Sequence, residues 1–99
     1  MEYQNIYDIL FNIMQKFPFS PALTRERFEK DKDLPLTGDV WIFGAVDMVY
    51  LFFEVEKEFG IHIAPKDLLH YRFNTIRQIA SIVSKYLSVS SSHGKEVSS

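Results

Sequence analysis

Histidines and carboxylates are the side chains of this sequence that could bind a metal or transfer protons. His62 and His70 lie eight residues apart, with no cysteine in the chain and no carboxylate cluster beside them. This spacing matches no established zinc-binding pattern, so we interpret both histidines as surface or packing residues. The sequence also has no glycine-rich phosphate loop and no Ser/His/Asp arrangement, so it gives a catalytic function no positive support.

Three carboxylates, Asp47, Glu54 and Glu58, fall near one another on one predicted helix, residues 45–59. Two carboxylates held close together can serve as an acid and a base. A solvated acidic face that meets basic groups on a partner uses the same residues, and we favour this interpretation over catalysis.

The elements that must position these residues are helices, because apolar residues recur every three or four positions. The period predicts helices over residues 3–17 and 45–59, the second ending at Gly60, where a left-handed cap is expected. A short helix is predicted at 65–70, after Pro65, and a last one from Thr75, which has capping-box spacing to Gln78. No segment has the pattern of a strand, so the fold class is all-α. The predicted core consists of residues on the main apolar face of each helix: Leu10, Ile13, Leu51, Val55, Phe59, Ile76, Ile79 and Val83.

The connection from Pro18 to Phe43 is long for a small domain and contains three prolines. Connections of this length usually carry function or contain a further helical turn, here residues 22–28. A third possibility is that its apolar residues only fix it to the core. We expect Trp41 to be a core or loop anchor rather than a ligand platform.

Length and composition favour one small domain at residues 1–87, followed by a flexible serine-rich tail at 88–99. The net charge is −2 and the basic residues are scattered, so the sequence predicts no basic surface that would bind nucleic acid. No stretch approaches the roughly 20 apolar residues of a membrane span, and no basic segment precedes the first apolar residues. With no cysteine, the chain fits a reducing compartment, so we expect a cytoplasmic protein.

Several runs resemble the acyl carrier proteins. They are Phe-Gly-Ala-Val-Asp-Met-Val-Tyr-Leu at 43–51, Glu-Lys-Glu-Phe-Gly-Ile-His-Ile-Ala-Pro at 56–65 and Phe-Asn-Thr-Ile at 73–76. The resemblance covers about residues 3–87. It implies a four-helix bundle with a long first loop and a short third helix.

The serine that holds 4'-phosphopantetheine in that family is missing here. In carrier proteins it lies in an Asp-Ser-Leu motif at the start of the second helix, and the corresponding residues are Gly44, Ala45 and Val46. Alanine has no oxygen to form the phosphodiester, so we expect no bound cofactor. Thr37, the nearest upstream hydroxyl, is better explained as a turn or capping residue. A working carrier whose serine was mutated, or whose attachment site lies elsewhere, is the alternative.

The run from Val46 to Ile61 also resembles a narrower group: carrier-related proteins of bacterial ribosomal-peptide (bacteriocin-like) maturation systems that lack the attachment serine. The resemblance implies a non-enzymatic accessory that docks a maturation or modification enzyme, or a peptide. A structural interaction subunit, in one form a dimer, is the other alternative, and the sequence leaves the oligomeric state open.

The predicted helix at 45–59 has a second apolar face. Val46, Val49, Tyr50 and Phe53, here called the outer stripe, project opposite the core-facing residues, and Lys57 continues their line. One helix cannot bury both faces in a small bundle, so we expect the outer stripe to be exposed, with Asp47 and Glu54 at its border. These six residues are the predicted partner-binding site. In the alternative, the long loop covers the stripe through Leu36, Val40 or Trp41.

Overall fold

The structure, a computed structural model, describes the backbone of residues 3–18 and 23–98, and the side chains of 5–18, 23–68 and 72–88. This part of the chain is all-helical, as predicted, and contains no strand. Its helices are α1 (Tyr3–Met14), α2 (Arg25–Lys30), α3 (Ala45–Phe59), α4 (Pro65–Tyr71) and α5 (Ile76–Ser98).

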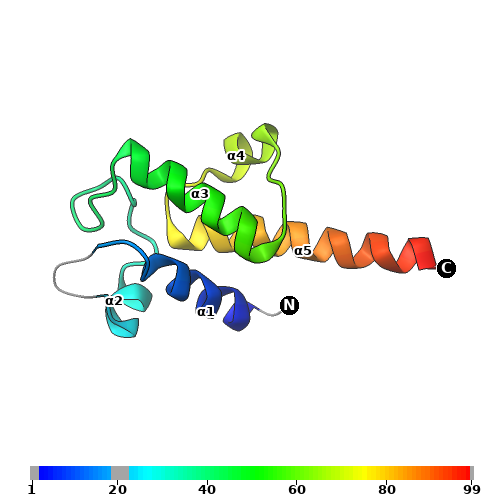
Figure 1. Ribbon diagram of the computed structural model, residues 1–99, viewed down its shortest axis with the longest axis horizontal. Helices are drawn as coiled ribbons and strands as arrows, with labels where there is room; N and C mark the ends of the chain where they lie inside the picture. Colours follow the sequence, from blue (N-terminus) through cyan, green and yellow to red (C-terminus); the bar gives the residue numbers. More distant parts are fainter. Residues whose placement is uncertain (1–2, 19–22, 99) are drawn as a thin grey trace.

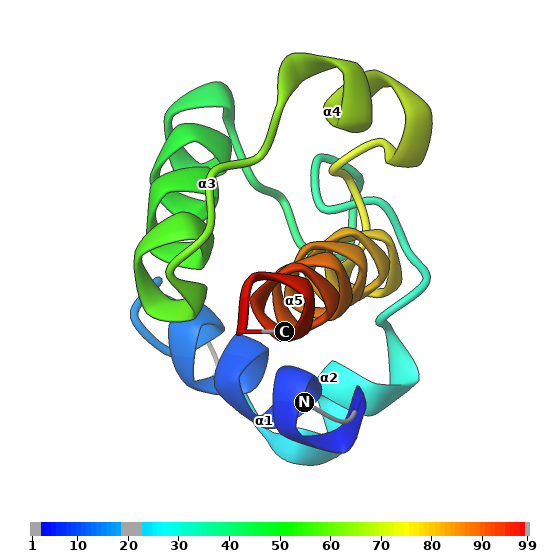
Figure 2. The same cartoon turned by 90° about the vertical axis from the view of Figure 1, so that its right-hand side faces the viewer.

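The first half of α5 is the centre of the fold (Figure 1). Helix α1 packs against both α5 and α3, and α4 packs against α5. Viewed along α5, the other helices surround it, with α3 and α4 on different sides and α1 and α2 together below (Figure 2). The described helices therefore enclose one core.

All eight residues predicted to form the core are buried in one cluster. Leu51 and Val55 of α3 have no exposed surface, and Phe59 closes the same face at the end of that helix. Core members outside that set of eight come from α1, α2, the connections and α5: Ile6, Tyr7, Met14, Leu23, Phe28, Leu36, Trp41, Phe43, Ile61, Ile63, Ala80 and Ile82.

Several boundaries differ from the prediction. Helix α1 ends at Met14 rather than Phe17, because Lys16 and Phe17 donate to carbonyls only three residues back and Pro18 cannot extend the helix. The predicted turn at 22–28 is α2, which starts at Arg25, and Ala22 lies outside the described residues. The predicted domain boundary at residue 87 falls inside α5, whose helical backbone reaches Ser98; the side chains of 89–99 are not described.

The start of α5 uses the predicted polar residues in a different way. The backbone N–H of Gln78 donates to Thr75 Oγ1 over 3.0 Å, as a capping box requires. The Gln78 side chain, however, accepts from the backbone N–H of Asn74 rather than of Thr75. The reciprocal half of the box is therefore displaced by one residue.

No helix among the described residues is long and apolar enough to cross a membrane.

Candidate functional site

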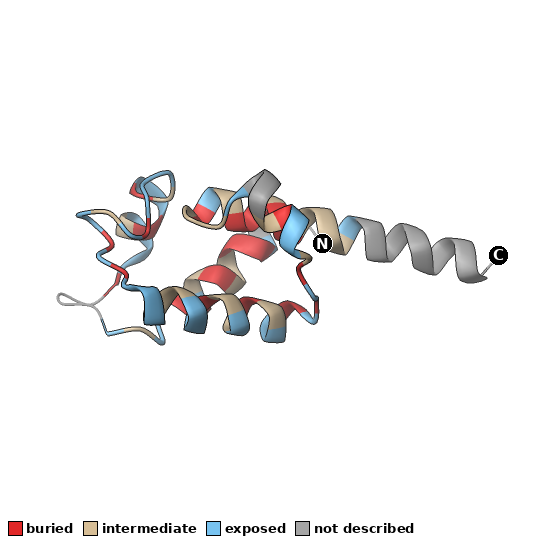
Figure 3. Ribbon diagram, turned by 90° about the horizontal axis from the view of Figure 1, so that it is seen from above, coloured by how far each residue is buried: buried red, intermediate tan, exposed pale blue. Residues whose placement is uncertain are grey.

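The outer stripe of α3 is exposed, as predicted. The side chains of Val46, Val49, Tyr50 and Phe53 are 69%, 54%, 64% and 60% exposed. Exposed residues follow the outer side of α3 and buried residues its inner side (Figure 3). Since α3 presents apolar side chains to solvent as well as to the core, it has the composition of a helix with a second packing partner.

The long loop does not cover the stripe. Leu36 and Trp41 point into the core, with 0% and 3% of their surface exposed. The N–H of Leu36 donates to the carbonyl of Asn74 over 2.7 Å, and Trp41 Nε1 donates to the carbonyl of Asp31 over 3.0 Å. The first bond attaches the loop to the connection before α5, and the second joins two parts of the loop itself. Since the four side chains of the stripe stay exposed, the alternative in which the loop covers them is wrong. The prediction that Trp41 is an anchor is confirmed.

The two carboxylates at the border of the stripe are engaged within the chain. Asp47 Oδ2 accepts the backbone N–H of Gly44 over 2.9 Å and so caps the start of α3. Glu54 Oε2 lies 2.7 Å from Lys16 Nζ, and this hydrogen bond holds the pKa of Glu54 below its usual value. Glu54 keeps its negative charge beside the stripe, but the ammonium of Lys16 offsets much of it.

The three carboxylates considered for acid–base chemistry, Asp47, Glu54 and Glu58, do not form an acid–base pair. Asp47 serves the helix cap, while Glu54 and Glu58 both face Lys16, with Glu58 at 3.8 Å. The lowered pKa of Glu54 keeps it ionised at neutral pH and unsuited to donating a proton. The arrangement is that of a charged helix face packed against the end of α1.

Ala45 is the first residue of α3 and is exposed to solvent. Its methyl group therefore lies where a modifying enzyme could reach it, yet it offers no oxygen. Thr37 is held in the loop: its hydroxyl lies 3.3 Å from Asn74 Oδ1, and its N–H donates to the same oxygen. These bonds give Thr37 the turn-stabilising role predicted for it.

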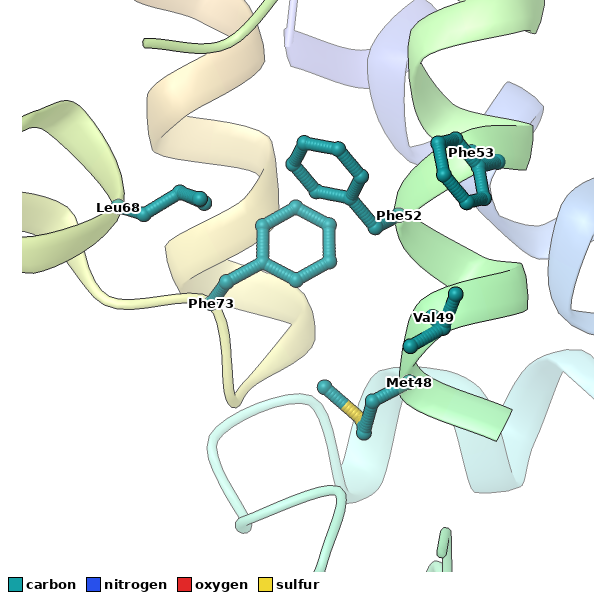
Figure 4. A pocket seen from close by; sticks show the side chains of 6 residues that line it. All are labelled: Met48, Val49, Phe52, Phe53, Leu68 and Phe73. Carbon is teal, nitrogen blue, oxygen red and sulfur yellow. The ribbon is translucent and has the colours of Figure 1, made fainter. Parts of the chain in front are cut away.

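Beside the stripe is an apolar pocket that the sequence did not reveal. It has a volume of about 410 Å³ and a lining with no polar surface, provided by Met48, Val49, Phe52, Phe53, Leu68 and Phe73. We call it the Phe52–Phe73 pocket. The rings of Phe52 and Phe73 meet edge to face, with centroids 5.6 Å apart, and Leu68 reaches toward them from α4 (Figure 4).

The sequence pattern placed Met48 and Phe52 on the core-facing side of α3, and the structure leaves them half-buried at the edge of the core. The pocket separates α3 from Leu68 of α4 and from Phe73, which line its other side. No local pattern encodes that separation. Val49 and Phe53 belong to both the pocket and the outer stripe, so the two features form one continuous apolar surface.

A smaller hollow, of about 290 Å³, lies on the other side of the stripe. Its lining mixes polar and apolar side chains: Lys16, Phe17, Pro18, Asp47, Tyr50 and Glu54. The stripe therefore runs between an apolar pocket and a charged one, so a bound partner would meet a different chemistry at each edge.

His62 is the histidine whose side chain the structure describes. His62 is fully exposed, and its Nδ1 lies 4.0 Å from Glu56 Oε2. The side chain of His70 lies outside the described residues. Among those that are described, no three His, Asp or Glu side chains are placed to hold a metal ion.

Comparisons with known proteins found no family model, no curated protein and no solved structure that matches this chain.

Proposed function

We propose that this protein is a non-enzymatic, acyl-carrier-like accessory that docks a protein or peptide through the outer stripe of α3 and carries no 4'-phosphopantetheine. The observation that carries the proposal is the exposure of four large apolar side chains on one face of α3, beginning one residue after Ala45. A surface of this kind, rimmed by charge, usually marks a binding site.

The order of the helices supports the carrier-like part of the proposal. Helices α1, α3, α4 and α5 have the succession expected of a carrier bundle, with α4, the third of them, much the shortest. Helix α2 lies within the long first connection. The side chain that would hold the cofactor is the methyl of Ala45, so any cargo would have to bind without a covalent link.

The proposed setting is a cytoplasmic peptide-maturation system of the bacteriocin type, and it rests on the resemblance of residues 46–61. The partner would then be a maturation enzyme or its precursor peptide. Products of genes that neighbour this one are the first candidates to test.

Intact-mass measurement tests the absence of the cofactor. The protein is co-expressed with a broad-specificity phosphopantetheinyl transferase, in the presence of coenzyme A, and then weighed. We expect an unchanged mass. An added phosphopantetheine would identify a working carrier and contradict the proposal.

Titration calorimetry with a maturation enzyme or precursor peptide encoded by a neighbouring gene tests the docking surface. The variant Val49→Ser/Phe53→Ser should melt close to the parent, because both side chains are more than half exposed, and should bind the partner at least tenfold more weakly. The matched control is Leu34→Ser/Val40→Ser, which removes two exposed apolar side chains outside α3. Equal loss of affinity in both variants would show that the stripe is not the docking site.

A further inference from the structure

The outer stripe is large for a surface that stays in water. Its four side chains expose on the order of 500 Å², given that a buried aromatic side chain covers about 150–250 Å². The largest apolar patch on a typical monomer covers about 300–600 Å². The half-buried side chains of the adjoining pocket add a little to it, so two copies would together bury about 1,000 Å², which is the lower end for a specific interface.

We propose that the stripe packs against the same stripe of a second copy of this chain, in an antiparallel arrangement about a two-fold axis near Tyr50 and Phe53. This dimer rests on the proposed function, since both require α3 to be a protein-binding face. In the isolated protein, the second copy of the chain is the partner that occupies this face. Two identical surfaces of this size bury enough area together for a specific dimer.

Charge selects the antiparallel direction. Lys57 continues the stripe at the C-terminal end of α3, and Asp47 lies at the N-terminal end. Antiparallel packing brings Lys57 of one copy beside Asp47 of the other, whereas parallel packing sets the two lysines against each other. The macrodipoles of the two α3 helices also oppose each other favourably in the antiparallel arrangement.

The Phe52–Phe73 pocket gives the pairing a specific contact. With the axis between Tyr50 and Phe53, Phe53 of the second copy lies opposite Tyr50 and next to Val49, at the rim of the pocket (Figure 4). Its ring can enter the pocket, and by symmetry the second copy's pocket receives the first Phe53. Aromatic side chains that fill pockets near the centre of an interface usually dominate its affinity.

Sedimentation equilibrium of the purified chain tests the pairing. We expect monomer and dimer in exchange between micromolar and millimolar concentration. Phe53→Asp, which sets two charges at the axis, should give a monomer throughout. Leu34→Asp places the same charge at an exposed apolar residue outside α3 and should dimerise like the parent. A parent that stays monomeric, or a Leu34→Asp variant that loses the dimer equally, would overturn the proposal.

Disulfide trapping tests the direction, and the chain suits it because it has no cysteine. About the proposed axis, position 46 of one copy lies beside position 57 of the other. The two positions 46 are about 16 Å apart along the helices, at 1.5 Å per residue. A mixture of Val46→Cys and Lys57→Cys should therefore cross-link, and Val46→Cys alone should not. Rapid cross-linking of Val46→Cys with itself would overturn the antiparallel arrangement.

These outcomes are separate from the test of partner docking. A monomeric protein that still loses partner affinity in Val49→Ser/Phe53→Ser retains the proposed function without the dimer. A dimer whose stripe variants bind the maturation partner as tightly as the parent retains the pairing and removes the proposed function.

Discussion

Ile42, before helix α3, and Gly60, at its end, both have a positive φ, of 57° and 65°. Glycine adopts this conformation freely, whereas a β-branched residue is strained in it. At Gly60 the conformation ends α3, and the cap N–H donates to the carbonyl of Glu56. At Ile42 the chain turns between two buried aromatic residues, Trp41 and Phe43, which leaves the isoleucine side chain 74% exposed.

Glycine at position 42 should therefore not destabilise the fold. The left-handed conformation costs a non-glycine residue about 1–2 kcal/mol, and glycine loses about 0.5–1 kcal/mol more conformational entropy on folding. The exposed side chain contributes little burial, so Ile42→Gly should be neutral or up to about 1 kcal/mol more stable in urea denaturation.

The opposite change at the other end of α3 is the matched control. Gly60→Ala places a side chain on a residue that also has a positive φ, with open space around it, and should cost about 1–2 kcal/mol. If Ile42→Gly destabilised the protein as much as Gly60→Ala does, the turn before α3 would depend on the isoleucine side chain itself.

The two ends of α3 also show what the sequence could predict. The helical period and Gly60 are local signals, and they placed the residues of α3 and its buried face correctly. The path of the loop before α3 depends on Leu36 bonding to Asn74, thirty-eight residues further along, and no local pattern carries that information.

The candidate site has one part that a single helix determines and another that several elements build. The exposure of Val46, Val49, Tyr50 and Phe53 follows from the geometry of a single helix, so the sequence could predict it. The Phe52–Phe73 pocket requires Leu68 and Phe73, which belong to other elements. The helix cap formed by Asp47 and the ion pair of Glu54 with Lys16 depend on detailed geometry, and composition identified these residues only as acidic.

The two faces of α3 should respond differently to the same substitution. Val55→Asn removes a fully buried side chain and leaves an amide without a partner in the core, at a combined cost of about 3–5 kcal/mol. Because small domains have only about 5–15 kcal/mol of stability, unfolding should lose much of its cooperativity. Val49→Asn, on the outer face, should change stability by about 0.5 kcal/mol or less. Circular-dichroism melts that coincide for Val55→Asn and the parent would refute the core assignment.

Restoring a serine at position 45 should not restore efficient cofactor attachment. Ala45 is exposed at the start of α3, so Ala45→Ser would present a hydroxyl to solvent. Gly44 and Val46, however, replace the aspartate and leucine that surround the serine in carrier proteins. We expect only a minor modified fraction by intact-mass measurement with transferase and coenzyme A. The triple variant Gly44→Asp/Ala45→Ser/Val46→Leu should be modified further, and near-complete conversion of Ala45→Ser alone would show that the neighbouring residues are dispensable.

The contact between α4 and α5 should depend on pH through one buried carboxylate. Asp67 of α4 accepts from Lys85 Nζ over 2.6 Å and from the hydroxyl of Tyr86, which itself accepts the N–H of Ala64 over 2.7 Å. The hydrogen bond from Lys85, followed by the one from Tyr86, holds the pKa of Asp67 below its ordinary value. The folded state thus favours the ionised carboxylate more than the unfolded state does.

This difference gives the sign of the pH effect. The stabilisation from Asp67 is fully present above the unfolded pKa of about 3.9 and is lost as the pH falls through the lower pKa of the folded state. Urea midpoints should therefore fall below about pH 4 in the parent. They should fall less steeply in Asp67→Asn, which is already weakened at neutral pH. The pKa values of Asp33 and Glu54 are also lowered, and these groups titrate in both proteins. The effect of Asp67 is therefore measured by the difference in urea midpoint between the parent and Asp67→Asn at each pH.

Leu68, the neighbour of Asp67, connects this network to the pocket. Loss of the Asp67 contacts should loosen α4 and expose Phe52 and Phe73 along with Leu68, so hydrogen exchange in α4 should rise in Asp67→Asn while that of α1 stays unchanged. Asp33→Asn, which removes the surface ion pair with Arg77, is the control and should leave α4 protected.

If the parent and Asp67→Asn kept a constant difference in urea midpoint from neutral pH to pH 3, the carboxylate of Asp67 would not be the titrating group.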